Sequence, residues 1–296
     1  MSEQASPKGA ILKETACRIW SILGNEIDSL TVDRAVIGLF FSGVKLSNGD
    51  AGVCFTPIKE IPEAVCCPSS LKAMPNSGNL AGMPVSYYLE DRPDSGALNK
   101  ALKIAVLNAL SATCWHRLPP NGYTFEQGID PLDNAVIPDE ASVVVVGALV
   151  PYIRKLIKRG KPFGILEKDP RTLKPAEMDY YIPPEKADER LAAADWLIVT
   201  STTLINDTLE DILAKARPGA EIILVGPTAS MLPEAFFRRG IKAIGGIAVT
   251  DADRLLSVLA EAGSGYHFYG KSAERLVIRH SSCSQRDECV PSECGC

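Results

Sequence analysis

The chain has 296 residues, of which 46% are hydrophobic and 23% charged, with 31 Lys and Arg against 36 Asp and Glu. The chain is too apolar to be disordered and too long to be a disulfide-stapled miniprotein. It also lacks the basic blocks typical of nucleic-acid-binding proteins. Its length suggests about two domains, each large enough to bury its own core.

The first half of the sequence has the pattern of a small α+β domain. Apolar residues at helical spacing predict a first helix: Leu12, Ala16, Ile19, Trp20, Leu23 and Ile27. Asn48-Gly49 separates two strand-like runs at 35–46 and 51–56, which predicts a hairpin with a two-residue type I′ turn. Lys45 and Asp50 flank this turn and are expected to be solvated. Residues 57–95 are expected to be mainly loop, with a short element near 85–89, and lead to a helix at about 96–114.

The second half alternates short apolar runs with helical patterns. Residues 117–140 contain several prolines and are expected to form the crossing between the halves. The apolar runs are 142–147, 163–166, 196–200, 221–225 and 243–249, and the helical patterns are 151–159, 185–194, 206–216, 233–239 and 251–262. Continuous Val, Ile and Leu runs are typical of strands buried on both faces, so the alternation predicts a doubly wound parallel sheet of an α/β fold.

Small and polar residues follow these predicted strands. Because open parallel sheets bind ligands at the carboxyl ends of their strands, these residues are the candidate ligand contacts. They are Gly147, Pro151, Glu167, Thr200, Ser201, Thr202, Asn206, Gly226, Pro227 and Thr228. Thr200 to Asn206 also admit a purely structural interpretation, in which the strand end is followed by Asn206 as the N-cap of the next helix.

A dinucleotide site is one interpretation of the first two predicted strand ends. Gly147 and Glu167 are separated by about 20 residues, as are the first glycine and the ribose-binding acid of a Rossmann fingerprint. The loop after Gly147 lacks the two further glycines, and Pro151 stands in the turn. Three interpretations of Gly147 and Glu167 therefore stay open. They form a tight turn with a solvated acid, or they bind an adenosyl or nucleotide ligand, or they bind another polar ligand. Glu167 and Asp169 are the candidate acid/base groups.

Asn108 is the polar residue in the apolar stretch IAVLNALSA of the last helix of the first half. A buried amide must find hydrogen-bond partners. Asn108 is therefore either a satisfied amide of the core or a ligand contact in a cleft between the domains.

The strings VVVVGALVPYIRKL, ILEKDP, ADWLIVTSTTLINDTLEDIL and ILVGPTASMLPEAFFRRGIKAIGGIAVTD resemble the putative heavy-metal chelation family. GLFFSGVKLSNGDAGVCFTP and ALKIAVLNALSA resemble its companion domain, which is similar to the N-terminal domain of enolase. The resemblance implies an enolase N-terminal-like domain at 1–125, a Rossmann-like domain at 126–279 and a site in the cleft between the domains. The cysteine-rich stretch at 280–296 lies beyond the resemblance and is expected to be an appended tail. Ala148 departs from the family pattern, where a bulkier polar residue such as His is expected, and this weakens the expectation of a metal ligand at the end of the first predicted strand.

Four of the nine cysteines fall within the last fourteen residues: Cys283, Cys289, Cys294 and Cys296. Four thiolates can hold Zn, Cu or an Fe–S cluster, although their spacing matches neither zinc knuckles nor a ferredoxin run. A redox thiol or a tail without a role are the alternatives. The pair Cys66-Cys67 is ambiguous, and Cys17, Cys54 and Cys114 lie on apolar segments and are expected in the core. His116, His267 and His280 show no metal-site spacing.

The N-terminus has no signal-peptide pattern and no apolar run is long enough to span a bilayer, so we expect a cytoplasmic protein without a membrane partner. The leading hypothesis is a metal-handling protein that binds a metal ion or a small chelator, with a transition metal (Zn, Fe or Cu) or an Fe–S cluster as cofactor and no nucleic acid. The alternative is an enzyme with an adenosyl or nicotinamide ligand, and a third class is a non-catalytic interaction module. The sequence gives no oligomeric state.

Overall fold

The computed structural model describes residues 7–60, 74, 76–90, 96–133 and 135–281. The elements of the first half are α1 (Ala10–Leu23), α2 (Glu26–Ser29), β1 (Val32–Ile37), β2 (Phe41–Leu46), β3 (Ala51–Phe55), the 3-10 helix η1 (Ile58–Glu60), α3 (Ser86–Leu89) and α4 (Gly96–Arg117). Strands β1, β2 and β3 form an antiparallel sheet in that order. The helix, hairpin and helix predicted for this half are present, but the run predicted as one strand at 35–46 contains the end of β1, a turn and β2, which pair antiparallel.

The hairpin between β2 and β3 differs from the predicted type I′ turn. That turn needs positive φ at both Asn48 and Gly49, but of the two only Gly49 has it, at 94°. The Gly49 N–H donates to the Leu46 carbonyl at 2.9 Å, and the Leu46 N–H donates to the Asp50 carbonyl at 2.8 Å. The loop is therefore one residue longer than predicted, with glycine at its single left-handed position.

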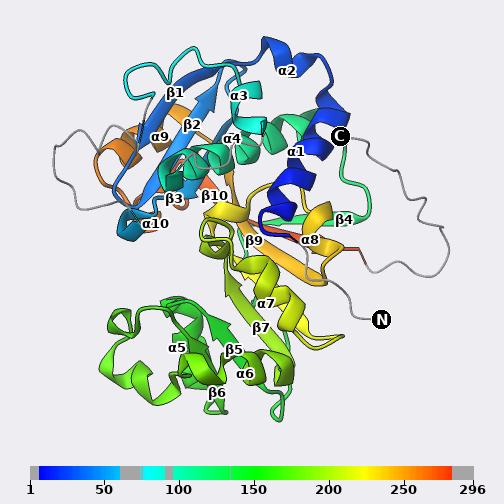
Figure 1. Cartoon of the computed structure of the whole chain (residues 1–296), viewed down its shortest axis with the longest axis vertical. Helices are drawn as coiled ribbons and strands as arrows, with labels where there is room; N and C mark the ends of the chain where they lie inside the picture. The colour runs from blue at the N-terminus through cyan, green and yellow to red at the C-terminus, as the bar shows by residue number, and fades with distance from the viewer. Residues whose placement is uncertain (1–6, 61–73, 75, 91–95, 134, 282–296) are drawn as a thin grey trace.

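The elements of the second half are β4 (Tyr123–Gln127), β5 (Val143–Val146), α5 (Val150–Arg159), β6 (Phe163–Leu166), η3 (Pro170–Thr172), η4 (Pro175–Tyr180), η5 (Pro184–Lys186), α6 (Ala187–Ala193), β7 (Trp196–Thr200), η6 (Ser201–Leu204), α7 (Leu209–Lys215), β8 (Glu221–Val225), η7 (Pro227–Ala229), α8 (Glu234–Phe237), β9 (Ile241–Val249), α9 (Ala252–Ala260), α10 (Gly265–Phe268) and β10 (Ala273–His280). Figure 1 shows β5, β6, α5 and α6 (green) at the opposite end of the molecule from β1 and β2 (blue).

The large sheet has the strand order β4-β10-β9-β8-β7-β5-β6. Strands β6, β5, β7, β8 and β9 are parallel, as predicted, and this confirms an α/β fold with a large, mostly parallel sheet. Two strands were not predicted: β10 pairs antiparallel with β9, and β4 pairs antiparallel with β10. Because β5 is followed by β6 on one side and β7 on the other, the strand order reverses between β5 and β7.

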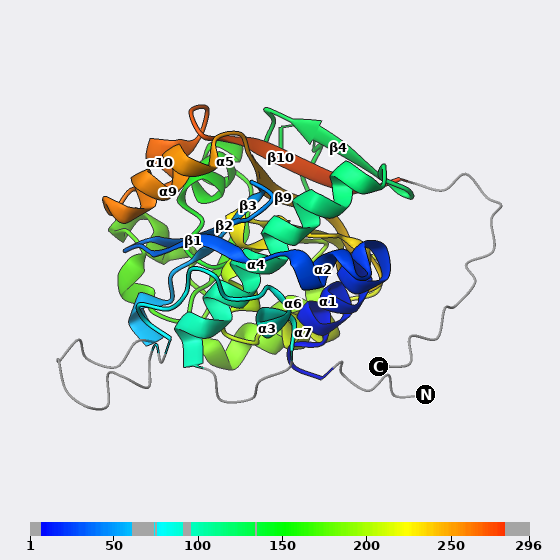
Figure 2. The same cartoon turned by 90° about the horizontal axis from the view of Figure 1, so that it is seen from above.

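Helices from both halves of the sequence enclose the small sheet. A Cβ at Gly52 would lie 2.2 Å from the Ala105 carbonyl oxygen, so the backbone of α4 rests directly on β3. A Cβ at Gly43 would lie 2.8 Å from side-chain methyl carbons of Leu256 and Leu259 in α9. Gly43 pairs with Val53 and Gly52 with Val44, so the two glycines face opposite sides of the sheet. Figure 2 shows α4 and α9 on either side of β1 and β2.

The two halves share one hydrophobic core. Leu110 of α4 and Phe236 of α8, both fully buried, belong to the same cluster of packed side chains. Strand β4 crosses the predicted domain boundary at 125/126, and α9 packs on the small sheet, so the boundaries remain a prediction. Cys54 and Cys114 are buried as predicted, whereas Cys17 is only partly buried. Among the residues described, no helix combines the length and apolarity needed to cross a membrane.

The contact at Gly52 gives the first testable prediction. Gly52→Ala should lower the free energy of unfolding by about 3 kcal/mol, because the new methyl group meets the backbone of α4, which cannot turn aside. Gly43→Ala should cost only about 1 kcal/mol, because its methyl group meets the ends of two leucine side chains. Urea unfolding of both variants and the parent measures the difference. Equal losses would contradict the backbone contact.

Candidate functional site

A cavity of about 760 Å³ lies at the carboxyl ends of the parallel strands. We call it the strand-end cavity. Most of the predicted ligand contacts line it: Gly147, Glu167, Thr200, Ser201, Thr202, Asn206, Gly226, Pro227 and Thr228. Its walls also include Val146, Leu166, Ile182 and Leu191. Side chains that are far apart in the sequence are thus brought together at one edge of the sheet, as the strand order requires.

The two glycines of this cavity allow neighbouring strand ends to pack closely. Gly147 has φ of 98°, and a Cβ there would lie 2.7 Å from Cγ2 of Thr200. Gly226 has φ of 130°, and a Cβ there would lie 2.3 Å from Oγ of Ser201. The left-handed backbone and the close neighbour both favour glycine. The space left by each glycine is therefore occupied by a hydroxyl-bearing side chain at or just after the end of β7, Thr200 for Gly147 and Ser201 for Gly226.

Threonine hydroxyls at and just after the end of β7 lie along the cavity. Oγ1 of Thr200 lies 3.1 Å from Oγ1 of Thr202 and caps the 3-10 helix η6 by accepting from the Thr202 N–H. The Thr203 hydroxyl donates to the Thr200 carbonyl at 2.6 Å. The tight turn that follows β7 thus holds several hydroxyl groups in fixed positions beside the cavity.

Asn206 lines the cavity but does not cap the following helix as the sequence predicted. Helix α7 begins at Leu209 with Thr208 in the N-cap position. The left-handed residue Asp207, with φ of 55°, turns the chain before the helix can start. The Asn206 Oδ1 accepts instead from the Thr208 hydroxyl at 2.6 Å.

Charged side chains are already engaged near the mouth of the cavity. Glu167 accepts from the Asp169 N–H at 3.0 Å. Asp169 forms ion pairs with Arg171 and with Lys59 of the first half, both at 2.8 Å. Hydrogen bonds from Arg171 and then Lys59 hold the pKa of Asp169 well below its usual range. Asp169 therefore stays ionised at neutral pH, which does not suit a general acid.

The first half of the chain closes one side of the strand-end cavity. Phe41 and Phe55 line it, with ring centroids 6.1 Å apart in an edge-to-face arrangement. Next to Phe55, burial raises the pKa of the Cys54 thiol well above its usual range, so this thiol stays protonated and unreactive. Neither aromatic residue was predicted to be a ligand contact, because their alternation in a strand is that of any core-facing residue.

Asn108 joins the two halves. Its amide nitrogen donates to the Val53 carbonyl of β3 at 2.7 Å. The same nitrogen lies 3.3 Å from the Pro227 carbonyl and 3.1 Å from the Thr228 carbonyl, both in η7. The side chain is thus a buried amide that is bonded to the backbone of both halves. This agrees with the first of the two alternatives for Asn108, an amide of the core with hydrogen-bond partners. Its Oδ1, however, is buried without a hydrogen-bond partner.

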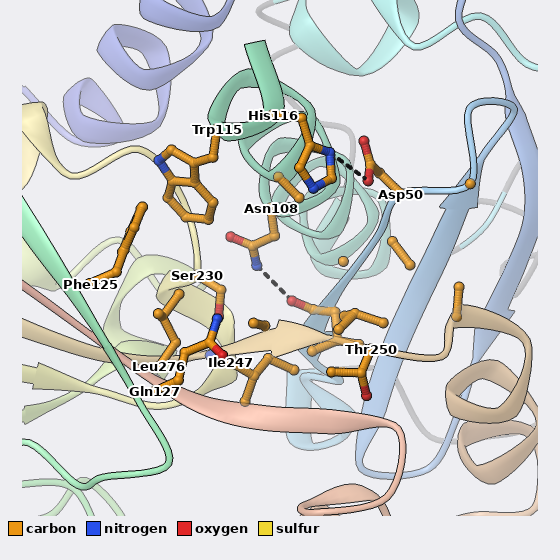
Figure 3. Close-up of a pocket in the computed structure, with 18 of the residues that line it drawn as sticks. Asp50, Asn108, Trp115, His116, Phe125, Gln127, Ser230, Ile247, Thr250 and Leu276 are labelled. Carbon is orange, nitrogen blue, oxygen red and sulfur yellow. Dashed lines mark hydrogen bonds and ion pairs between the residues drawn. The ribbon is translucent and has the colours of Figure 1, made fainter. Parts of the chain in front are cut away.

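A second cavity of about 380 Å³, the Asn108 cavity, lies between the halves on the other side of this contact. Figure 3 shows Asn108 between Trp115 and Ser230, with Asp50 and His116 at the far end. The expected solvation of Asp50 is wrong: only 15% of its side chain is exposed, because Thr113 and Asn48 hydrogen-bond it. Lys45 is mostly covered as well and pairs with Asp253 at 2.9 Å.

Pro151 lies apart from the other predicted contacts. It stands in the first turn of α5 and lines a third cavity of about 410 Å³. That cavity is bordered by Asp130, which accepts from the Tyr152 hydroxyl at 2.7 Å. Gly226 lines both this cavity and the strand-end cavity, so the two adjoin at the end of β8.

Within the described ranges, no group of three or more His, Cys, Asp or Glu side chains could hold a metal ion. The predicted metal ligands Cys283, Cys289, Cys294 and Cys296 lie outside those ranges, as do Cys66 and Cys67. The donors that line the strand-end cavity are mainly hydroxyl groups, an amide and three carboxylates, of which Glu167 and Asp188 are bonded elsewhere. They do not form a coordination shell for a bare soft metal ion.

Similar proteins have been found by sequence and by structure. An uncharacterized protein of Methanocaldococcus jannaschii is 31% identical over 201 residues, which cover 66% of this chain and 73% of the relative. A crystal structure of a protein of unknown function from Pyrococcus horikoshii has a TM-score of 0.70 at 17% identity, covering 92% of this chain and 99% of that chain. A second such structure, from Desulfitobacterium hafniense, has a TM-score of 0.63 at 21% identity, with coverage of 88% and 99%.

Two family models match the chain, one at residues 130–278 and one at residues 21–111, and both carry the description "Putative heavy-metal chelation". The first model spans β5 to β9 and most of β10 of the large sheet, and the second spans the small sheet and most of α4. The two solved structures come from the family of the first model and share the fold. The chain therefore belongs to the family described as putative heavy-metal chelation.

Proposed function

We infer that this chain is a metal-handling protein whose strand-end cavity binds a small polar ligand that carries a chelated metal ion. The observation that supports this best is the gathering of the predicted contacts along one cavity of about 760 Å³. Cavities of this size, mostly apolar and with a few fixed polar groups, are typical of sites for small organic molecules.

The lining of the cavity suits a chelator better than a free ion. Hydroxyl groups from Thr200 and Thr202 offer hydrogen bonds to carboxylate or phenolate oxygens, which are common in chelators. Phe41 and Phe55 offer apolar surface to the carbon skeleton of such a ligand. In this arrangement the ligand supplies the donor atoms for the metal, and the protein binds the outside of the complex.

The cysteine-rich tail provides a different kind of donor. Thiolates bind soft ions such as Zn²⁺ and Cu(I), which hydroxyl-rich sites bind poorly. Cys283, Cys289, Cys294 and Cys296 are proposed to capture or deliver the metal, while the cavity binds the chelated form.

The competing occupant of the cavity is an adenosyl or nicotinamide ligand, which would make the protein an enzyme. Its support is that Gly147 and Glu167 line the same cavity. Against it, one carboxylate oxygen of Glu167 already accepts from the Asp169 N–H. The ligand found in the first experiment below decides between the two occupants.

Filling the cavity tests the proposal. Protein purified without added chelators should carry a small molecule and a transition metal together, seen by native mass spectrometry and elemental analysis. Ala148→Trp, which places an indole in the cavity, should lower the amount of both at least about tenfold. Ala192→Trp, on the exposed face of α6, is the matched control and should retain them.

Two results of that experiment would overturn the proposal. A parent protein with neither metal nor small molecule in the cavity contradicts it directly. A metal-free nucleotide that is lost in Ala148→Trp supports the competing enzyme instead.

The tail is tested separately in the full-length chain. Replacing Cys283, Cys289, Cys294 and Cys296 together by Ser should abolish the thiolate-to-cobalt absorption that anaerobic titration of the parent with Co²⁺ is expected to produce. Cys54→Ser and Cys114→Ser serve as controls for buried thiols and should keep this absorption. Absence of the absorption in the parent, or its survival in the quadruple variant, would contradict a metal site in the tail.

A further inference from the structure

The Asn108 cavity is separate from the strand-end cavity and has its own chemistry. It is lined by the β2–β3 turn and α4 of the first half, and by β4, β9 and β10 of the second. The backbone of η7, which Asn108 binds, lies between the two cavities. At about 380 Å³ it has room for a small organic molecule.

The amide of Asn108 can be oriented in only one way. Its nitrogen faces three backbone carbonyl oxygens, so exchanging nitrogen and oxygen would place four acceptors against one another. The Oδ1 therefore points away from these carbonyls, into the space between Trp115 and Ser230 (Figure 3). The residue is 2% exposed and this oxygen has no partner. A buried acceptor without a partner is costly, and only a donor that enters from the cavity side can satisfy it.

Negative charge lies at the other end of the cavity. Of the described residues that line it, Asp50 and His116 are ionisable. Oδ2 of Asp50 accepts from the Thr113 hydroxyl at 2.6 Å and from the Asn48 amide at 3.1 Å, which fixes the carboxylate. Its Oδ1 lies 3.4 Å from Nδ1 of His116, whose side chain is 71% exposed. The cavity thus favours a neutral or cationic ligand.

Aromatic side chains form a wall of the cavity. The rings of Trp115 and Phe125 meet edge to face with centroids 4.8 Å apart. The indole N–H of Trp115 donates to the Tyr123 hydroxyl at 3.1 Å, which holds the ring in place. An indole attracts a planar cation that lies against its face.

We propose that the Asn108 cavity is a second ligand site, which binds a small planar organic cation of the amidine or guanidine class. An N–H group of this cation donates to the Asn108 oxygen, the negative charge of Asp50 at the other end of the cavity attracts it, and its flat face packs on Trp115. Asn108 offers a hydrogen-bond acceptor, Asp50 a negative charge and Trp115 an aromatic face. A planar nitrogenous cation can interact favourably with all three, whereas a carboxylate or phosphate group can interact favourably with none.

Benzamidine is a suitable probe, with neutral benzamide and anionic benzoate as matched comparisons. In calorimetry or ligand-observed NMR with the full-length protein, benzamidine should bind most tightly, benzamide about tenfold or more weakly, and benzoate not measurably. Asp50→Asn should weaken benzamidine about tenfold and leave benzamide unchanged, since it removes charge while keeping an oxygen for Thr113.

Ala112 of α4 lines the cavity, so Ala112→Leu should block benzamidine. Ala260→Leu on the exposed side of α9 is the matched control. Thermal unfolding of each variant shows whether it is folded. Ala148→Trp, which fills the strand-end cavity, should leave benzamidine binding unchanged, so this site and the proposed function can fail independently.

Equal binding of benzamidine and benzoate, or binding that survives Ala112→Leu in folded protein, would overturn the proposal. So would the absence of benzamidine binding to the parent, which would mean that water alone satisfies the Asn108 oxygen.

Discussion

The structure depends on one side-chain amide at the junction of its two halves. Asn108 sits where α4 rests on β3, a contact so close that only glycine fits at position 52. From there its amide nitrogen reaches the backbone of both β3 and η7. The Phe55 N–H completes the junction by donating to the Thr228 hydroxyl at 3.0 Å. A shift of α4 would strain the bonds of Asn108 to β3 and to η7 at the same time, so these bonds help to fix how the small sheet packs on the large one.

Both cavities owe their shape to this junction. On one side, η7 carries Pro227 and Thr228 into the wall of the strand-end cavity, where Phe41 and Phe55 of the small sheet face it. On the other side, the oxygen of the same amide borders the second cavity. A loop that follows β8 is therefore positioned by a helix more than a hundred residues earlier in the chain.

The sequence predicted what depends on local periodicity and on the parallel strand pattern. The runs at 163–166, 196–200 and 221–225 coincide with β6, β7 and β8, and the residues after them meet along one cavity because parallel strands end at the same edge. Strands β4 and β10 were missed because they pair antiparallel with residues distant in the sequence. The turn at Asn48-Gly49 was misassigned because propensity does not fix which residue takes the left-handed conformation.

In the site too, the local sequence pattern predicted which residues lie at strand ends, but not the contacts that packing creates between them. Thr200 and Gly226 stand at strand ends, so the sequence pattern predicted them to be near a ligand. The close contact between Gly147 and Thr200 depends instead on the spacing of neighbouring strands, which the sequence pattern does not show. Asp50 looked like a solvated turn residue because its partner Thr113 lies on a helix 63 positions away. A side chain that is partnered across the fold gives no signal in its own sequence neighbourhood.

Under the proposed function, the distribution of donor atoms would let one chain bind a metal in two chemical states. Oxygen and nitrogen groups line the strand-end cavity, and one of its carboxylates, Glu167, is bonded to the backbone. Thiolates, which compete best for bare soft ions, are concentrated beyond the last strand at 283–296. In that proposal, keeping the thiolates in a separate part of the sequence keeps them from holding a metal permanently in the cavity. A protein that exchanges a metal between a chelator and thiolates needs this separation, because a single strong site would hold the ion rather than pass it on.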